Sequence, residues 1–199
     1  MLVVKMDKWN NAQEKELIFW KAKWDFPVLY KIKYNCFLNV IESFDKNSNV
    51  LDIGCGAYTF SGLFGFKNLW LIDSLMESYR NVNNNLLYSS AQISCPVEDV
   101  LCKFRDNIFD IVFFLNCADH INPDSLEYIF IELRRILHFS GKLFFYSDFR
   151  NNEKECDECH PFIFTKQDYD KLTLKFQKIF TFTGKSNEKD LGAIWSIMI

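Results

Sequence analysis

Short apolar runs alternate with segments of helical pattern along the middle of the chain, and this alternation restricts the fold more than any other feature. The runs are apolar on both faces, and strands of that kind belong to a parallel sheet covered by helices on each side. The expected helices are residues 74–88 and 123–138. The expected strands are residues 50–53, 69–73, 92–94, 109–115 and 142–146. The sequence therefore predicts a layered α/β fold.

The two ends of the chain depart from this alternation. Residues 7–47 have a helical pattern that breaks at Phe26-Pro27, so we expect a second helix over about 28–44. Residues 176–182 and 193–199 are strand-like and predict an antiparallel pair at the sheet edge. The 199 residues contain no repeat or clear linker, so we expect a single domain, 1–199. Its parts are a helical N-terminal cap (1–47), a core (48–150) and a C-terminal segment (151–199).

Charge and cysteine usage limit the partners and the compartment. The formal net charge is -3, from 23 Lys and Arg against 26 Asp and Glu, which gives no general attraction to nucleic acid or anionic lipid. No stretch approaches the roughly 20 apolar residues of a membrane helix, and the N-terminus has no signal-peptide pattern. Seven scattered cysteines indicate reduced thiols. We expect a cytoplasmic protein without a nucleic-acid or membrane partner.

One cysteine pair is close enough in sequence to suggest a metal. Cys156 and Cys159 precede His160 in a pattern that matches haem attachment and also half of a zinc site. A structural zinc site needs four ligands, and the chain has no second pair with suitable spacing. We therefore expect an exposed acidic loop here and no metal, with a metal ion as the less favoured alternative.

Glycines and carboxylates follow the first two expected strands, where ligands bind in an open parallel sheet. Gly54 and Gly56 permit a tight turn and a close approach of backbone to ligand. Asp73, at the end of the second strand, suits ribose hydroxyls. A dinucleotide fingerprint needs a third glycine where Thr59 stands, and Asp52 would repel a pyrophosphate. The charges favour a cationic ligand, S-adenosylmethionine (SAM), over a nicotinamide cofactor.

The ordered motifs resemble those of class I SAM-dependent methyltransferases. They lie within residues 48–150, at 50–56, 71–73, 96–99, 109–112 and 132–137, the last before Ser140-Gly141. Residues 116–121 and 160–162 are similar to a small-molecule branch of the family, the type 11-like methyltransferases. The resemblance implies an α/β, Rossmann-like three-layer sandwich. Its mostly parallel seven-stranded sheet would have an antiparallel edge strand, and residues 151–199 would add an acceptor loop.

The resemblance also implies roles for individual residues. Two positions depart from the family pattern, since Tyr58 replaces a glycine and Pro96 replaces an acidic residue. From their positions along the chain, and not from the resemblance, we expect Trp20, His120 and His160 to contact the acceptor. The cofactor would contact Asp52, Gly54, Cys55, Gly56, Asp73, Ser74, Val97, Glu98 and Asn116.

His120 is the candidate catalytic residue. Methyl transfer is an in-line displacement that mainly needs alignment and desolvation, but a hydroxyl or protonated amine must also lose a proton. His120 follows the fourth expected strand, and its pKa range suits a general base. The alternative is that His120 caps the helix beginning near Pro123 or packs at the rim of the cleft. We expect a SAM-dependent methyltransferase acting on a small molecule; the alternatives are a non-catalytic regulatory protein of this fold and an NAD-dependent oxidoreductase.

Overall fold

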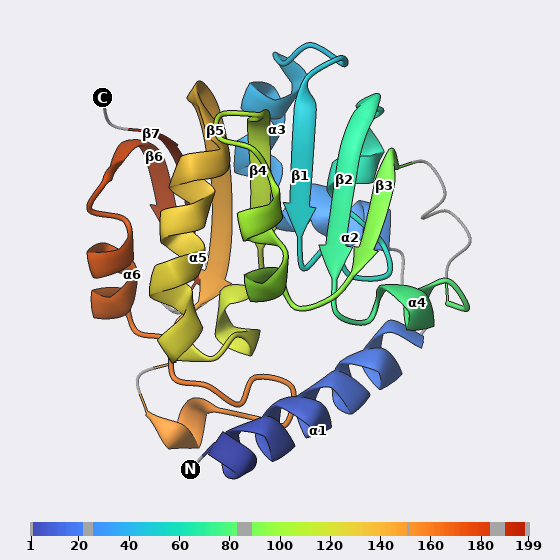
Figure 1. The fold of residues 1–199 in the computed structure, drawn as a ribbon, viewed down its shortest axis with the longest axis vertical. Coiled ribbons are helices and arrows are strands. Elements are labelled where there is room, and N and C mark those ends of the chain that lie inside the picture. Colours follow the sequence, from blue (N-terminus) through green and yellow to red (C-terminus); the bar gives the residue numbers. More distant parts are fainter. Residues whose placement is uncertain (1, 22–25, 83–88, 151, 184–189, 198–199) are drawn as a thin grey trace.

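The computed structural model describes residues 2–21, 26–82, 89–150, 152–183 and 190–197, and its centre is one seven-stranded sheet (Figure 1). The strand order is β3-β2-β1-β4-β5-β7-β6. The strands are β1 (Asn49–Ile53), β2 (Asn68–Asp73), β3 (Ala91–Ser94), β4 (Phe109–Leu115), β5 (Leu137–Asp148), β6 (Phe176–Thr183) and β7 (Asp190–Ile197).

Strand direction follows the expected scheme, with one difference at the edge. The first five strands pair in parallel, β1 with both β2 and β4, β2 with β3, and β4 with β5. β7 runs antiparallel to β5 and to β6. The antiparallel strand therefore lies one position inside the sheet, and β6 forms the edge. Residues 198 and 199, at the end of the last expected strand, lie outside the described residues.

Helices cover both faces of the sheet and one of its ends. α5 and α6 lie on one face, α2 and α3 lie on the other, and α1 crosses below the carboxyl ends of the strands (Figure 1). The α/β layered fold is thus confirmed. The helices are α1 (Leu2–Lys21), α2 (Phe26–Lys33), α3 (Asn35–Glu42), α4 (Met76–Tyr79), α5 (Pro123–Ile136) and α6 (Lys166–Leu172). No helix among these described residues has the length and apolar character needed to cross a bilayer.

β4 shows how the sequence builds two cores from one sheet. Its side chains alternate, so that Val112 and Phe114 pack in the cluster under α5, while Ile111 and Phe113 pack in the cluster under α3. All four are fully buried. A central strand with helices on both faces has no solvent side, which is why its sequence is apolar throughout.

Three expected local elements differ in the structure. The helix expected over 28–44 is divided at Tyr34, whose buried ring packs against Tyr146 while its backbone leaves helical geometry (φ -107°, ψ 22°). In the described part of the helix expected over 74–88, only α4 is helical, and residues 83–88 lie outside the described residues. The turn expected at 139–141 lies within β5, where the pairing with β4 shifts register.

Two phenylalanines test the contribution of the core. Phe113→Ala removes a fully buried ring that stacks on Phe144 at 5.1 Å, and should lower the free energy of unfolding by about 3–5 kcal/mol. Phe139 is 59% exposed, so Phe139→Ala should change it by about 0.5 kcal/mol or less. Urea unfolding measures both, and similar losses for the two variants would contradict this description of the core.

Candidate functional site

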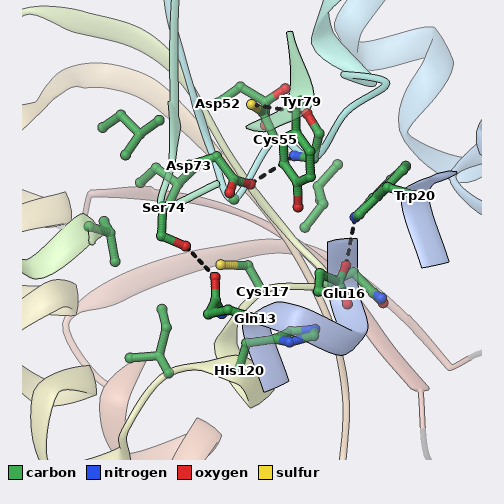
Figure 2. Close-up of a pocket in the computed structure, with 18 of the residues that line it drawn as sticks. Gln13, Glu16, Trp20, Asp52, Cys55, Asp73, Ser74, Tyr79, Cys117 and His120 are labelled. Atoms are coloured by element: carbon green, nitrogen blue, oxygen red, sulfur yellow. Dashed lines mark hydrogen bonds between the residues drawn. The ribbon is translucent and has the colours of Figure 1, made fainter. Parts of the chain in front are cut away.

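A cavity of about 340 Å³ is lined by residues at the carboxyl ends of the strands and by residues of α1 (Figure 2). Every residue that the sequence analysis assigned to the cofactor or the acceptor lines this cavity. They are Trp20, Asp52, Gly54, Cys55, Gly56, Asp73, Ser74, Val97, Glu98, Asn116, His120 and His160. The structure thus brings together residues from four strand ends, the N-terminal helix and a distant loop.

The glycine turn after β1 is shaped by close packing. Gly54 and Gly56 have φ of +63° and +64°, a backbone region that side chains other than glycine rarely adopt. A Cβ on Gly54 would overlap the Cys117 side chain, and one on Gly56 would overlap the Trp20 ring. Trp20 therefore packs directly on the turn, and its contact with an acceptor stays a prediction.

Asp52 lies beneath this turn as a buried carboxylate. It is 3% exposed and accepts hydrogen bonds from the hydroxyls of Thr59, at 3.0 Å, and Ser61. Burial raises the pKa of Asp52 to about 6, and the two hydroxyls oppose that rise. Near neutral pH the Asp52 carboxylate is negatively charged, and the partners that stabilise this charge are neutral groups, including the two hydroxyls.

Asp73 ties the end of β2 to the glycine turn. One carboxylate oxygen accepts from the Gly56 amide at 3.0 Å, and the other accepts from the Leu75 amide at 2.9 Å. Burial raises the pKa of Asp73 to about 6, the two amides oppose the rise, and the charge of Glu16 adds to it. Each oxygen keeps acceptor capacity toward a ligand.

Five residues of α1 line the cavity, and the sequence analysis assigned only Trp20 among them; the five are Trp9, Gln13, Glu16, Phe19 and Trp20. Gln13 accepts a hydrogen bond from the Ser74 hydroxyl, and Glu16 accepts one from the Trp20 indole N–H at 2.7 Å (Figure 2). Glu16 and Gln13 were overlooked although their helical spacing from Trp20 was visible. The spacing shows a shared helix face, but not what that face contacts.

Asn116 directly follows β4 and contacts helix α2. Its backbone has φ +56°, and its amide N–H donates to the carbonyl of Tyr146 at 2.6 Å. Lys33 of α2 donates to the Asn116 side-chain oxygen at 2.8 Å and lies 4.7 Å from the centre of the Tyr146 ring. Lys33 is a further cavity residue that the sequence analysis did not identify.

His120 and His160 form the opposite side of the cavity, with ring centres 4.5 Å apart. The His120 side chain has no hydrogen-bond or ion-pair partner in the described part of the chain. The alternative role for His120 as a helix cap is wrong, because Asn122 caps α5 by accepting from the Asp124 amide at 3.2 Å. Burial lowers the pKa of His160.

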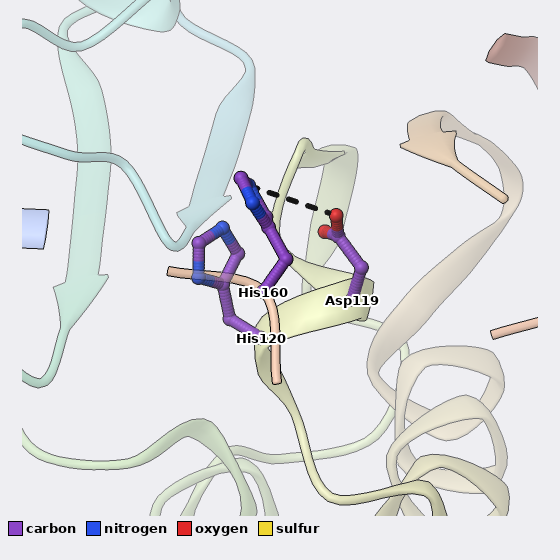
Figure 3. A group of neighbouring side chains, drawn as sticks. All are labelled: Asp119, His120 and His160. Atoms are coloured by element: carbon purple, nitrogen blue, oxygen red, sulfur yellow. Dashed lines mark ion pairs between the residues drawn. The ribbon is translucent and has the colours of Figure 1, made fainter. Parts of the chain in front are cut away.

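The surroundings of His160 differ from those expected from sequence. Its ring lies with Asp119 and His120, and one possible ligand atom from each lies within 4.8 Å of the others (Figure 3). Cys156 and Cys159, the sequence neighbours considered for a metal, are free thiols outside this group. The side-chain grouping is therefore set by the fold and not by the Cys-x-x-Cys-His order.

The glycine turn supplies a matched test of close packing. Gly65 has φ +67° and open space for 4 Å around the position that a Cβ would take, so Gly65→Ala should cost about 1–2 kcal/mol of unfolding free energy from backbone strain alone. Gly56→Ala has the same strain plus the overlap with Trp20, and should cost more while shifting tryptophan fluorescence. Equal losses and unchanged fluorescence would show that Trp20 does not pack on the turn.

Comparisons with known proteins agree with this fold. Residues 51–145 match the family model described as a methyltransferase domain. No curated protein sequence matches the chain. The structure is similar to N-methyltransferase NodS from Bradyrhizobium japonicum in complex with S-adenosyl-L-homocysteine, with TM-score 0.69 and 18% identity, covering 94% of this chain and 98% of that one.

Two further solved structures extend the comparison. A Pyrococcus horikoshii protein gives TM-score 0.66 and 21% identity, over 85% of this chain and 91% of that one. Geranyl diphosphate C-methyltransferase from Streptomyces coelicolor gives TM-score 0.64 and 10% identity, over 84% of this chain and 76% of that one. The fold is therefore the Rossmann-like methyltransferase fold. In sequence, residues 51–145 match a methyltransferase domain, and this segment contains most of β1, the strands β2 to β4 and the glycine turn.

Proposed function

We propose that this chain transfers the methyl group of SAM to a small-molecule acceptor inside the cavity at the carboxyl edge of the sheet. The observation that carries the proposal is the convergence of Asp52, the glycine turn, Asp73 and His120 on that one cavity. Two of the similar structures are named as an N-methyltransferase and as a geranyl diphosphate C-methyltransferase, which supports a small acceptor.

The charge around the cavity supports SAM as the cofactor. Its lining includes four carboxylates and one lysine, Lys33; the carboxylates are those of Glu16, Asp52, Asp73 and Glu98. A negative cavity attracts the ammonium and sulfonium of SAM and repels the pyrophosphate of a nicotinamide dinucleotide. The oxidoreductase alternative is thereby disfavoured.

The cofactor-binding residues divide into three groups in this proposal. Asp52 and the turn with Gly54, Cys55 and Gly56 serve the methionine end. Asp73 and Ser74 serve the ribose, because the Asp73 carboxylate keeps acceptor capacity for two hydroxyls. Val97 and the half-buried Glu98 flank the adenine, and Asn116 lies near the transferred methyl.

The acceptor meets His120, His160 and Trp20 in this proposal. His120 is the catalytic residue, since its ring faces the cavity without a protein partner in the described part of the chain. It acts on the attacking atom of the acceptor, while the aromatic lining excludes water from the displacement.

We further propose that residues 1–199 work as one methyltransferase domain in the cytoplasm, without a nucleic-acid or membrane partner. All seven cysteines are free thiols, as suits a reducing compartment. The net charge of -3 argues against general binding to polyanions.

Titration with SAM and with S-adenosyl-L-homocysteine at several pH values tests the cofactor assignment. Asp52 and Asp73 both have pKa values raised to about 6, so they become neutral as the pH falls through that value. Neutral carboxyls attract a cation less, so SAM affinity should fall roughly tenfold between pH 7.5 and pH 5. Asp52→Asn should weaken binding and flatten this dependence. Absence of saturable binding of either ligand would leave the non-catalytic alternative.

Replacing histidines tests the acceptor side. His120→Ala should lower turnover about tenfold or more with SAM affinity nearly unchanged, because the ring contacts the acceptor and not the cofactor. His138 lies outside the cavity, hydrogen-bonded to Ser140, and His138→Ala is the matched control with unchanged turnover. Release of S-adenosyl-L-homocysteine with hydroxyl, amine and carboxylate acceptors is the measurement. Wild-type turnover in His120→Ala would refute the role.

A further inference from the structure

We propose that Asp119, His120 and His160 bind a divalent transition-metal ion on the acceptor side of the cavity. Asp119 and His120 are consecutive in the 3-10 turn η5 (Ala118–His120) after β4, and His160 lies in the loop between β5 and α6. The fold brings two imidazoles and one carboxylate together, with one ligand atom of each within 4.8 Å of the others (Figure 3).

The hydrogen bonds of His160 leave one ring nitrogen available to a cation. Its Nδ1 lies 2.9 and 3.0 Å from the two oxygens of Asp157. A carboxylate only accepts hydrogen bonds, so Nδ1 carries the hydrogen. The other nitrogen, Nε2, faces Asp119 Oδ2 at 3.8 Å, beyond hydrogen-bond distance. In the neutral ring this places a lone pair opposite a carboxylate oxygen, an arrangement that a cation between them stabilises.

Asp157 is the outer-sphere residue of this site, because it hydrogen-bonds to the ligand His160 and does not itself bind the ion. Histidines that bind metals usually donate their second ring N–H to a carboxylate or carbonyl, which fixes the ring orientation and makes the ligating nitrogen more basic. The bonds from His160 to Asp157 match that pattern. Asp157 is therefore a positioning residue in this proposal.

Asp119 supplies the buried carboxylate. Its residue is fully buried, and its Oδ2 forms an ion pair with Arg150. Its Oδ1 has no hydrogen-bond partner in the described part of the chain, which is unusual for a buried oxygen. The carboxylates of Asp119 and Asp157 outnumber the single guanidinium of Arg150, so the cluster with neutral imidazoles keeps net negative charge.

The donor set selects the kind of ion. Two imidazole nitrogens and one carboxylate suit Zn²⁺, Co²⁺ or Fe²⁺, whereas Mg²⁺ and Ca²⁺ prefer oxygen ligands. Three protein ligands leave coordination positions open, and His120 and His160 line the cavity. The open coordination positions therefore face the acceptor, which carries an oxygen or nitrogen atom that binds the ion. This statement about the acceptor rests on the proposed function.

Metal titration of the full chain, after treatment with a chelator, tests the site. Co²⁺ and Zn²⁺ should each bind at one ion per chain, and Mg²⁺ should not bind. Calorimetry measures the binding of each ion, and the visible spectrum reports on Co²⁺. His120→Ala and His160→Ala should each weaken binding about tenfold or more, and Asp157→Asn about 10- to 100-fold. Asp119→Asn also disturbs the buried pair with Arg150, so the histidine variants decide the outcome.

The cysteine pair provides the control for a competing site. Cys156→Ser should leave Co²⁺ affinity unchanged, and the Co²⁺ spectrum should contain no thiolate charge-transfer band. Loss of binding in Cys156→Ser with retention in His120→Ala would move the ion to the cysteines and overturn the proposal. Absence of Co²⁺ and Zn²⁺ binding to the wild type would also overturn it. SAM titration of the same samples reports on the proposed function separately, since neither result depends on the other.

Discussion

The hydrogen bond from the Gly56 amide to the Asp73 carboxylate is the interaction on which the site depends. It joins the turn after β1 to the end of β2, two neighbouring parallel strands. The positive φ of Gly56 aims that amide at Asp73, and Trp20 of α1 packs on the same glycine. Sheet, turn and cap helix therefore meet at one residue, and a change at Gly56 affects all three.

Burial of Asp52 and Asp73 has a consequence for stability. Their pKa values are raised to about 6, above the usual value of 3.8, so the folded chain holds these protons more tightly than the unfolded chain. The stability that these groups contribute is present below about pH 4 and is lost as the pH rises through 6. Near neutral pH the unliganded protein carries two poorly compensated charges. In the proposed function, the cationic SAM stabilises these charges, which would couple SAM binding to stability.

Tyr58 shows how a departure from a family motif is accommodated. The family has a glycine there, and a ring at that position was expected to crowd the turn. In the structure Tyr58 stacks on Trp20, with ring centres 6.2 Å apart and planes 27° apart. The added ring thus packs against the cap helix, and its bulk contributes to holding α1 over the cavity.

The sequence by itself determined the parallel sheet and the side of the cavity that the glycine turn and Asp73 form. Strands buried on both faces produce a visible apolar pattern, and the glycine turn and Asp73 lie at strand ends, where local spacing fixes their position. It did not determine where the helix expected over 28–44 is divided, because the tertiary packing of Tyr34 decides that. Only the tertiary structure decided the side of the cavity that His120 and His160 form. Asp119 and Arg150 are 31 residues apart, and His160 reaches them from a separate loop, so their contacts depend on long-range packing that no local pattern records.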